Sequence, residues 1–466
     1  MATPNEATLP KEMLSFVLRH GEFSKAGLRL GQLIIKGRSP IPTPNFVGST
    51  SRGVVPHVTQ DVLSKTTRIP AVYIGLEDFI EKTPPKAPIL RQPSGKLSSK
   101  LRDFIALPSD CVAILGARRV PALDCPKQNT NTAISICTSV GFQSLELDDY
   151  VKCISELQAD ITVGLADVVT TEAISQKRLE KSADRTHAWL RDTLTPRLDD
   201  PDSQGPLFAF VPPLEPHQQS FYLGDLADDY KKEITGLSFL SPETAASLQK
   251  DLEALPRLCL SDPSSPQNVL RAIRLGNDMI TVPLVNGASE SGIAMTFFFD
   301  SIPDGQDIPL GFDLLATPHA TDLSPLVSGC QCYTCTKHHR AYLHHLLSAK
   351  EMLAWTLLQI HNFHHIDVFF QQIRNAIEDG TFEEKAKAFS RAYDSEMPQS
   401  LGQGPRTRGY QAKSVGGGEP KRNERAYGRL EEHARKLEEA ESGIATPEAE
   451  LDALDLQKQG LGEVQQ

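Results

Sequence analysis

The sequence predicts an α/β protein whose main domain is a (β/α)8 TIM barrel with insertions and a small metal-binding subdomain. Apolar strand-like runs alternate with amphipathic helical patterns over about 300 residues, which is typical of repeated βα units. The 466-residue chain is long enough to bury a large core. Three cysteines between residues 330 and 335 indicate the metal-binding subdomain. On periodicity alone, a doubly wound parallel sheet fits the alternation nearly as well.

The elements follow one another in the order that a barrel requires. Residues 12–75 predict short strands, because their β-rich runs are broken by clusters of glycine and proline. Beyond residue 100, strands and helices alternate. The predicted strands lie at 111–116, 160–169, 206–213, 256–261 and 278–284, and the predicted helices at 148–159, 182–198, 241–255 and 265–276.

Apolar residues at three- and four-residue spacing predict two further helices, at 338–365 and 367–380. We therefore expect one barrel domain at 12–395, with its zinc subdomain at about 325–395. The remaining segment, 396–466, is rich in glycine and charge. We expect it to be a mostly disordered tail with one possible charged helix.

Composition narrows the class of protein. The formal net charge is −11, with 39% hydrophobic and 23% charged residues, which argues against a strongly basic, non-specific nucleic-acid binder. No apolar run approaches the roughly 20 residues of a membrane span, so we expect no stable membrane insertion. Eight scattered or clustered cysteines do not form a secreted disulfide pattern. We expect a cytoplasmic protein, and peripheral association with the mitochondrial outer surface stays open.

The cysteine cluster is a candidate zinc site. Cys330, Cys332 and Cys335 are spaced by one and two residues, so a tight turn can direct all three thiolates at one ion. The alternative, three unliganded core cysteines, does not account for this spacing. Zinc takes four tetrahedral sulfur or nitrogen ligands, and the fourth must come from elsewhere in the chain. Four protein ligands would leave no open position for water, which favours one structural zinc ion over a catalytic one.

Histidine is the expected fourth ligand. His338 and His339 are too near to reach back from a helix that begins at them. The remaining candidates are His344, His345, His361, His364 and His365. We favour His361, at the end of a helix long enough to fold back, with Asn362 capping or turning the chain.

Several segments together resemble the tRNA-guanine transglycosylase family. The most specific is "CQCYTC", followed by "HHRAYLHHLL", "EMLAWTLLQIHN" and "FFQQIRNAIEDGTFEE". The opening "HGEFSKAGLRLGQLIIKG" and the later "KRLEKSADRTHAWL" and "NVLRAIRLGNDMI" are similar as well. The resemblance covers roughly 12–395 and implies a (β/α)8 barrel with a structural zinc ion held by three cysteines and one histidine. It also implies a dimer interface around the zinc subdomain, so we expect 330–395 to contact a partner.

The family exchanges guanine in a tRNA anticodon loop for a modified base through a covalent intermediate. Such chemistry needs one carboxylate nucleophile and a second carboxylate for proton transfer. In this chain "TSVGFQ" matches the proton-transfer motif, and it places Thr138 where the family has aspartate. "GNDMITVPL" matches the nucleophile motif and places Thr281 there. A threonine hydroxyl is a poor replacement in either role.

Base-recognition positions differ too. The matching aspartate falls at Ala166, although a shift of one residue would make it Asp167. A base-reading amide is replaced within 211–213, "VPP", and a glycine pair that lies against the base is reduced to Gly236. Cys137, beside Thr138, has no activating histidine near it in sequence, so we do not expect it to be a nucleophile.

The resemblance therefore implies a catalytically inactive accessory subunit of a queuine-inserting transglycosylase. It would form a heterodimer with a catalytic paralogue, contact tRNA through that complex, and support exchange of guanine for queuine at wobble position 34 of tRNAs with GUN anticodons. Two alternatives remain. One is a base or nucleoside hydrolase that uses Asp148, Asp149 or Asp167. The other is a zinc-containing tRNA-binding scaffold that acts alone.

Overall fold

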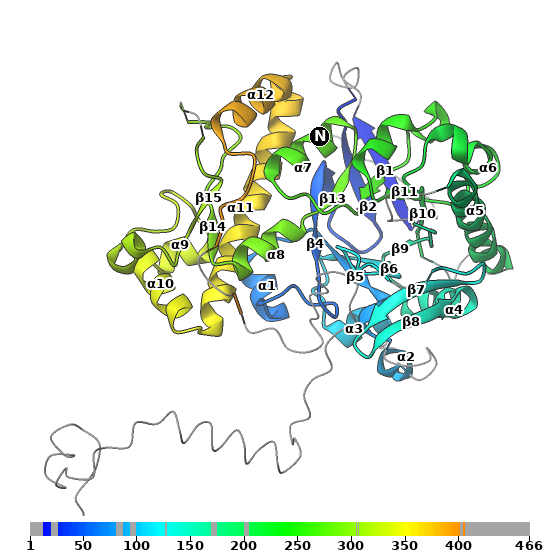
Figure 1. Ribbon diagram of the computed structural model, residues 1–466, viewed down its shortest axis with the longest axis horizontal. Helices are drawn as coiled ribbons and strands as arrows, with labels where there is room; N and C mark the ends of the chain where they lie inside the picture. Colours follow the sequence, from blue (N-terminus) through cyan, green and yellow to red (C-terminus); the bar gives the residue numbers. More distant parts are fainter. Residues whose placement is uncertain are drawn as a thin grey trace, which may run out of the picture.

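A closed barrel of eight parallel strands forms the centre of the protein and confirms the predicted fold class (Figure 1). The computed structural model describes residues 13–19, 27–80, 87–93, 99–125, 128–168, 175–199, 205–303, 305, 307–400 and 404–405. Neighbouring strands are hydrogen-bonded in the closed order β4-β5-β6-β9-β10-β11-β12-β13, and β13 pairs with β4 to complete the ring.

The barrel strands are short and connected mainly by helices. Their bounds are β4 Asn45–Ser49, β5 Ala71–Gly75, β6 Val112–Gly116, β9 Ile161–Val163, β10 Leu207–Phe210, β11 Gly236–Phe239, β12 Arg257–Cys259 and β13 Met279–Thr281. The connecting helices are α1 Gln60–Thr66, α2 Pro88–Arg91, α3 Lys100–Ile105, α4 Leu147–Leu157, α5 Gln176–Asp199, α6 Ser220–Asp228, α7 Pro266–Arg274 and α8 Pro283–Glu290. They surround the barrel in the manner of a TIM barrel (Figure 1).

Side chains of alternate residues fill the barrel interior. Val47, Tyr73, Ile114 and Phe208 belong to one buried cluster, because successive residues of a strand point to opposite sides. Gly236 opens β11 against this cluster. A Cβ atom there would lie 2.5 Å from the Phe208 ring, so the ring occupies the space that a larger residue would need.

Two small antiparallel sheets accompany the barrel. Strands β1 Leu14–Arg19, β2 Leu30–Ile35 and β3 Ile41–Thr43 form a sheet whose Leu33 and Ile41 join the interior cluster. Strands β7 Ala133–Thr138 and β8 Gly141–Glu146 form a hairpin between β6 and α4.

One predicted helix is wrong. Residues 241–255 form two 3-10 turns, η6 Pro242–Ser247 and η7 Lys250–Leu252, with Leu248 and Gln249 extended between them. Their apolar side chains, among them Ala245 and Leu252, pack into one cluster with α6 and β11. Tertiary packing here overrides the local helix preference.

The C-terminal part lies beside the barrel (Figure 1). Its elements are β14 Ile293–Met295, β15 Gly311–Asp313, η8 Thr317–Thr321, α9 Tyr333–Lys337, α10 Arg340–Ser348, α11 Met352–Glu378 and α12 Phe382–Ala392. The single helix predicted over 338–365 is wrong, because α10 ends at Ser348 and α11 begins at Met352. The predicted boundary at residue 366 is wrong as well, because α11 runs through it as one continuous helix.

The predicted tail, 396–466, lies outside the described residues except for 396–400 and 404–405. Within this short described part, the Ser400 hydroxyl donates to the Ser291 carbonyl at 2.6 Å, so the chain contacts the end of α8. Among the helices that the structure describes, none is both long and apolar enough to cross a membrane.

Candidate metal centre and barrel-mouth pocket

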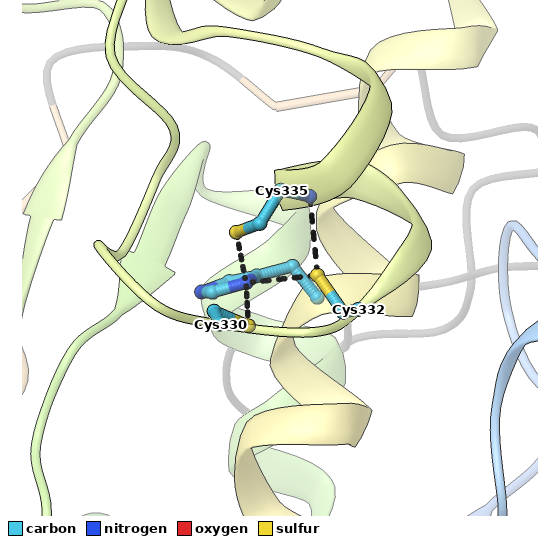
Figure 2. Close-up of side chains that lie close together, drawn as sticks. Cys330, Cys332 and Cys335 are labelled. Carbon is cyan, nitrogen blue, oxygen red and sulfur yellow. Dashed lines mark hydrogen bonds between the residues drawn. The ribbon is translucent and has the colours of Figure 1, made fainter.

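Four side chains that the sequence singled out converge in the C-terminal part. The ligand atoms of Cys330, Cys332, Cys335 and His361 all lie within 4.8 Å of one another. Figure 2 shows the three cysteines directed at a common point, with dashed lines that join them to an imidazole ring. The loop before α9 and the first turn of α9 supply the sulfurs, and α11 supplies the ring.

The distances fit a tetrahedral zinc ion. Nδ1 of His361 lies 3.9, 3.5 and 3.4 Å from the Sγ atoms of Cys330, Cys332 and Cys335. Zinc bonds of about 2.3 Å to sulfur and about 2.0 Å to nitrogen would separate tetrahedral S and N ligands by roughly 3.6 Å. The cluster could therefore hold a metal ion without rearrangement of these side chains.

Hydrogen bonds from neighbouring groups set the orientation and protonation of these side chains. The other ring nitrogen of His361, Nε2, lies 3.0 Å from the Met295 carbonyl, to which its N–H donates, and this leaves Nδ1 as the lone-pair donor. The Cys335 N–H donates to Sγ of Cys332 at 3.2 Å. Hydrogen bonds from the thiols of Cys332 and Cys335 lower the pKa of Cys330, which favours a thiolate there.

His361 does not lie at a helix end, as the sequence analysis expected. His361 is the tenth residue of α11 and is fully buried, and the helix continues through Asn362. The Asn362 amide donates to Ser289 Oγ and the Ile293 carbonyl, both at 2.9 Å, and its Oδ1 accepts from the Met295 N–H at 3.0 Å. Asn362 therefore fixes the rotation of α11 that aims His361 at the cysteines.

The other histidines have different environments. The His338 ring stacks on Tyr342, with centroids 5.2 Å apart, and Nδ1 of His339 accepts the Tyr342 N–H at the start of α10. His365 is buried one helical turn beyond His361, and burial lowers its pKa to about 3. Within the described chain, none of these rings joins the group of four.

A pocket of about 480 Å³ opens where the carboxyl ends of the barrel strands meet. Ala166, Phe210, Leu240 and Leu260 line it from the ends of four different strands. Active sites of TIM barrels occupy this end, because the βα loops there surround one opening. Among the described lining residues the only carboxylate is Asp124.

The two threonines do not line this pocket. Thr138 lies in the β7–β8 hairpin, outside the barrel, and its hydroxyl donates to the Gly141 carbonyl at 2.9 Å. Thr281 ends β13, is fully buried, and donates to the Ser261 carbonyl at 2.6 Å. The Thr138 hydroxyl thus bonds within its own hairpin turn, and the Thr281 hydroxyl bonds to the chain that follows the neighbouring strand β12. The barrel strand next to the hairpin, β6, ends in Gly116 without a functional group.

Asp167 is buried in a network that the sequence did not reveal. Arg178 donates to both of its carboxylate oxygens at 2.8 Å, Arg185 donates at 2.9 Å, and the Asn129 amide donates at 2.7 Å. The carboxylate therefore holds α5 to the end of β9. The signal in the sequence was only two arginines seven residues apart, of which Arg185 alone lies in the predicted helix 182–198.

The remaining candidates are not at the pocket either. Asp148 and Asp149 lie in the first turn of α4. Residues 211–213 and Gly236 are also absent from the lining. Burial raises the pKa of the Cys137 thiol, the opposite of what an activated nucleophile requires.

Together the fold and the cluster define a (β/α)8-barrel protein with a Cys3His cluster, after its last barrel strand, that could hold a metal ion. The family model described as "Queuine tRNA-ribosyltransferase" matches residues 24–395. The chain belongs to this family.

Similar proteins carry a more particular name. "Queuine tRNA-ribosyltransferase accessory subunit 2" of Schizosaccharomyces pombe is 35% identical over 400 residues, which covers 83% of this chain and 86% of that protein. Proteins of the same name from Anopheles gambiae and Gallus gallus are 29% and 26% identical, and each match covers 78% of this chain. These two matches cover 87% and 95% of the relatives themselves.

Proposed function

We propose that this chain is the catalytically inactive accessory subunit of a queuine tRNA-ribosyltransferase. It pairs with a catalytic subunit and supports exchange of guanine for queuine at position 34 of tRNAs with GUN anticodons. The named relatives and the family membership support the complex and its reaction. The domain that acts spans 12–395, with the zinc subdomain from about 325 onward.

The composition of the barrel-mouth pocket carries the proposal of inactivity. Double displacement at a ribose needs two carboxylates about 5 Å apart that flank the glycosidic bond to be broken. Asp124, which is exposed, is the single carboxylate of the described lining, and Ala166 contributes only a methyl group. The hydrolase alternative loses support for the same reason, because Asp167 is bound by two arginines and is not among the residues that line the pocket.

The zinc subdomain supports a role in pairing. Leu323, Tyr333, Met352 and Leu353 are large hydrophobic side chains with 44–74% of their surface exposed. Adjacent exposed apolar residues such as Met352 and Leu353, at the start of α11, favour a protein partner. We propose that one structural zinc ion, held by the cysteines and His361, keeps the loop before α9 in the shape that the catalytic subunit contacts.

The cysteines support a reducing, cytoplasmic compartment. All eight are free thiols, and three of them form the metal cluster, which oxidation would destroy. Contact with tRNA occurs in this proposal through the heterodimer, with the accessory subunit helping to hold one anticodon loop.

A base-exchange assay tests the proposal. Labelled guanine or queuine would be offered to a GUN-anticodon tRNA with this protein alone, with the catalytic subunit alone, and with both. A tRNA with adenine at position 34 is the control for site specificity. We expect exchange in the mixture and none by this chain alone. Exchange by this chain alone would overturn the assignment of inactivity, and a mixture no more active than the catalytic subunit alone would overturn the accessory role.

A further inference from the structure

A surface pocket of about 620 Å³ lies where α12 packs against the end of α7 (Figure 1). Three of the side chains that line it are cationic and one is anionic. The lining residues are Arg274 of α7 and, from α12, Glu383, Ala386, Lys387, Ser390 and Arg391. The pocket therefore carries net positive charge, although the chain as a whole has a formal net charge of −11.

The anionic side chain neutralises only one of the three cations. Oε1 of Glu383 accepts from Nε of Arg274 at 2.8 Å, and that guanidinium lies 6.0 Å from the centre of the Phe382 ring. Lys387 and Arg391 are exposed, and within the described ranges no carboxylate pairs with either of them. They are four residues apart and so lie on one face of α12, where like charges repel each other. An acidic partner would relieve that repulsion.

The chain itself contains a segment of the opposite charge. Residues 437–456, "LEEAESGIATPEAELDALDL", hold seven carboxylates and no lysine or arginine, and we call them the acidic segment. The stretch before it, 406–436, has nine lysines and arginines against four glutamates, so the pocket would repel it. Charge complementarity therefore selects the acidic segment within the tail.

Chain length permits the contact. Ser400, which is held at the end of α8, follows Arg391 by nine residues, so at most about 30 Å of extended chain separates the two. The last described residue is Pro405, and 31 residues lie between it and Leu437. Such a stretch spans up to about 100 Å when extended. The tail is therefore long enough for the acidic segment to return to α12.

We propose that the acidic segment docks on the pocket between α7 and α12 of its own chain. Its carboxylates pair with Lys387 and Arg391 and supply the counter-charge that these two side chains lack. The contact is electrostatic and exposed, so it weakens when salt screens the charges. While docked, the segment keeps other polyanions, such as RNA, off this face of the protein. This inference is independent of the accessory role proposed above.

Carbodiimide cross-linking of the full chain tests the contact, because this reagent joins a lysine amine to a carboxylate that touches it. Mass spectrometry would map the linked peptides at low salt and at about 1 M salt, where the screening length falls to about 3 Å. We expect links from Lys387 to the acidic segment at low salt and their loss at high salt. Lys181 is the matched control, because it is exposed on α5, well apart from α12 (Figure 1). It should give at least about fivefold fewer such links, the effect of one or two exposed ion pairs.

Two variants separate docking from chance encounters. Arg391→Glu and Ser390→Glu each add a negative charge at the pocket and keep the reactive amine of Lys387. Each should lower the yield of Lys387 links about fivefold, because attraction is replaced by repulsion. Arg191→Glu is the matched control, since Arg191 is exposed on α5, and it should leave the yield unchanged. Melting temperatures would show that each variant is folded.

The proposal is overturned if Lys387 gives no links to the acidic segment, or if the folded Arg391→Glu and Ser390→Glu proteins link like the unmodified chain. A mixture of isotope-labelled and unlabelled chains identifies the source of the segment. Links that join labelled to unlabelled peptides would assign the contact to a second copy and overturn docking within one chain. Weaker RNA binding by Arg391→Glu with unchanged links would assign the pocket to RNA instead.

Discussion

Asp167→Asn replaces a carboxylate that is fully buried and receives N–H groups from Arg178, Arg185 and Asn129. The asparagine keeps the shape but removes the charge, so two guanidinium groups lose their counter-ion. Breaking a buried ion pair in this way costs about 3–5 kcal/mol. The arginine side chains are 23% and 12% exposed, so water takes over part of the loss and the lower end, about 3 kcal/mol, is expected.

Thermal unfolding measures this cost. A domain of roughly 380 residues has an unfolding entropy of roughly 0.8 kcal/mol/K, so 3 kcal/mol lowers Tm by about 4 °C. Asp192→Asn is the matched control. Asp192 pairs with Arg191 at the surface, where the two side chains are 46% and 62% exposed, and its loss should change Tm by less than about 1 °C.

Activity of the complex separates a structural role of Asp167 from a chemical one. The folded Asp167→Asn protein should support base exchange by the catalytic subunit as well as the unmodified chain does. Equal melting temperatures for the two variants would refute the structural reasoning. Loss of exchange in a correctly folded complex would show that Asp167 takes part in the reaction.

Three other changes follow from the structure. His361→Ala should lose zinc by elemental mass spectrometry and weaken partner binding, and His364→Ala should retain the metal; retention by both would show that His361 is not a ligand. Burial raises the pKa of Cys259 to about 11, so this thiol should lower folding stability between about pH 9 and pH 11 by about 1.4 kcal/mol per unit. Cys259→Ala should reduce the slope in urea titrations by that amount, and the contribution of Cys111 and Cys153, whose pKa burial raises to about 12, should remain. Gly236→Ala places a Cβ within 2.5 Å of a phenylalanine ring and should cost about 1–3 kcal/mol, whereas Gly224→Ala, with open space on α6, should be neutral or stabilising in the same melts.

Much of the barrel could be predicted because its strands carry their own signals. "CVAILG" and "PLFAFVPP" are short apolar runs between helical patterns, and they became β6 and β10. Segment 241–255 could not be predicted in the same way. Its spacing suits a helix, but its apolar side chains pack against α6 and β11, and local sequence does not report that contact.

The metal cluster was predictable to the extent that it is local. Cysteines two and three positions apart can lie on one turn, so their convergence follows from chain geometry. The ring of His361 comes from a helix, and its aim depends on Asn362, which binds α8 and β14. Because that contact joins residues about 70 positions apart, the sequence indicated a histidine but misplaced it at a helix end.

The pocket was the least predictable feature. Motif spacing led to Thr138 as a position of lost chemistry, whereas the structure places it in a hairpin outside the barrel. Which side chains face the pocket depends on where each barrel strand ends. Only the three-dimensional arrangement shows that Arg118, two residues past β6, lines the same space as Leu260, one residue past β12.

Closure of the barrel by β4 and β13 has a consequence during translation, because the two paired strands are made far apart in time. Asn45 pairs with Met279, so β4 leaves the ribosome with one edge exposed and waits for a partner more than two hundred residues later. At 5–20 residues per second, that wait lasts tens of seconds. During this interval one edge of β4 stays unpaired, and its free N–H and C=O groups are open to pairing with another polypeptide until β13 covers them.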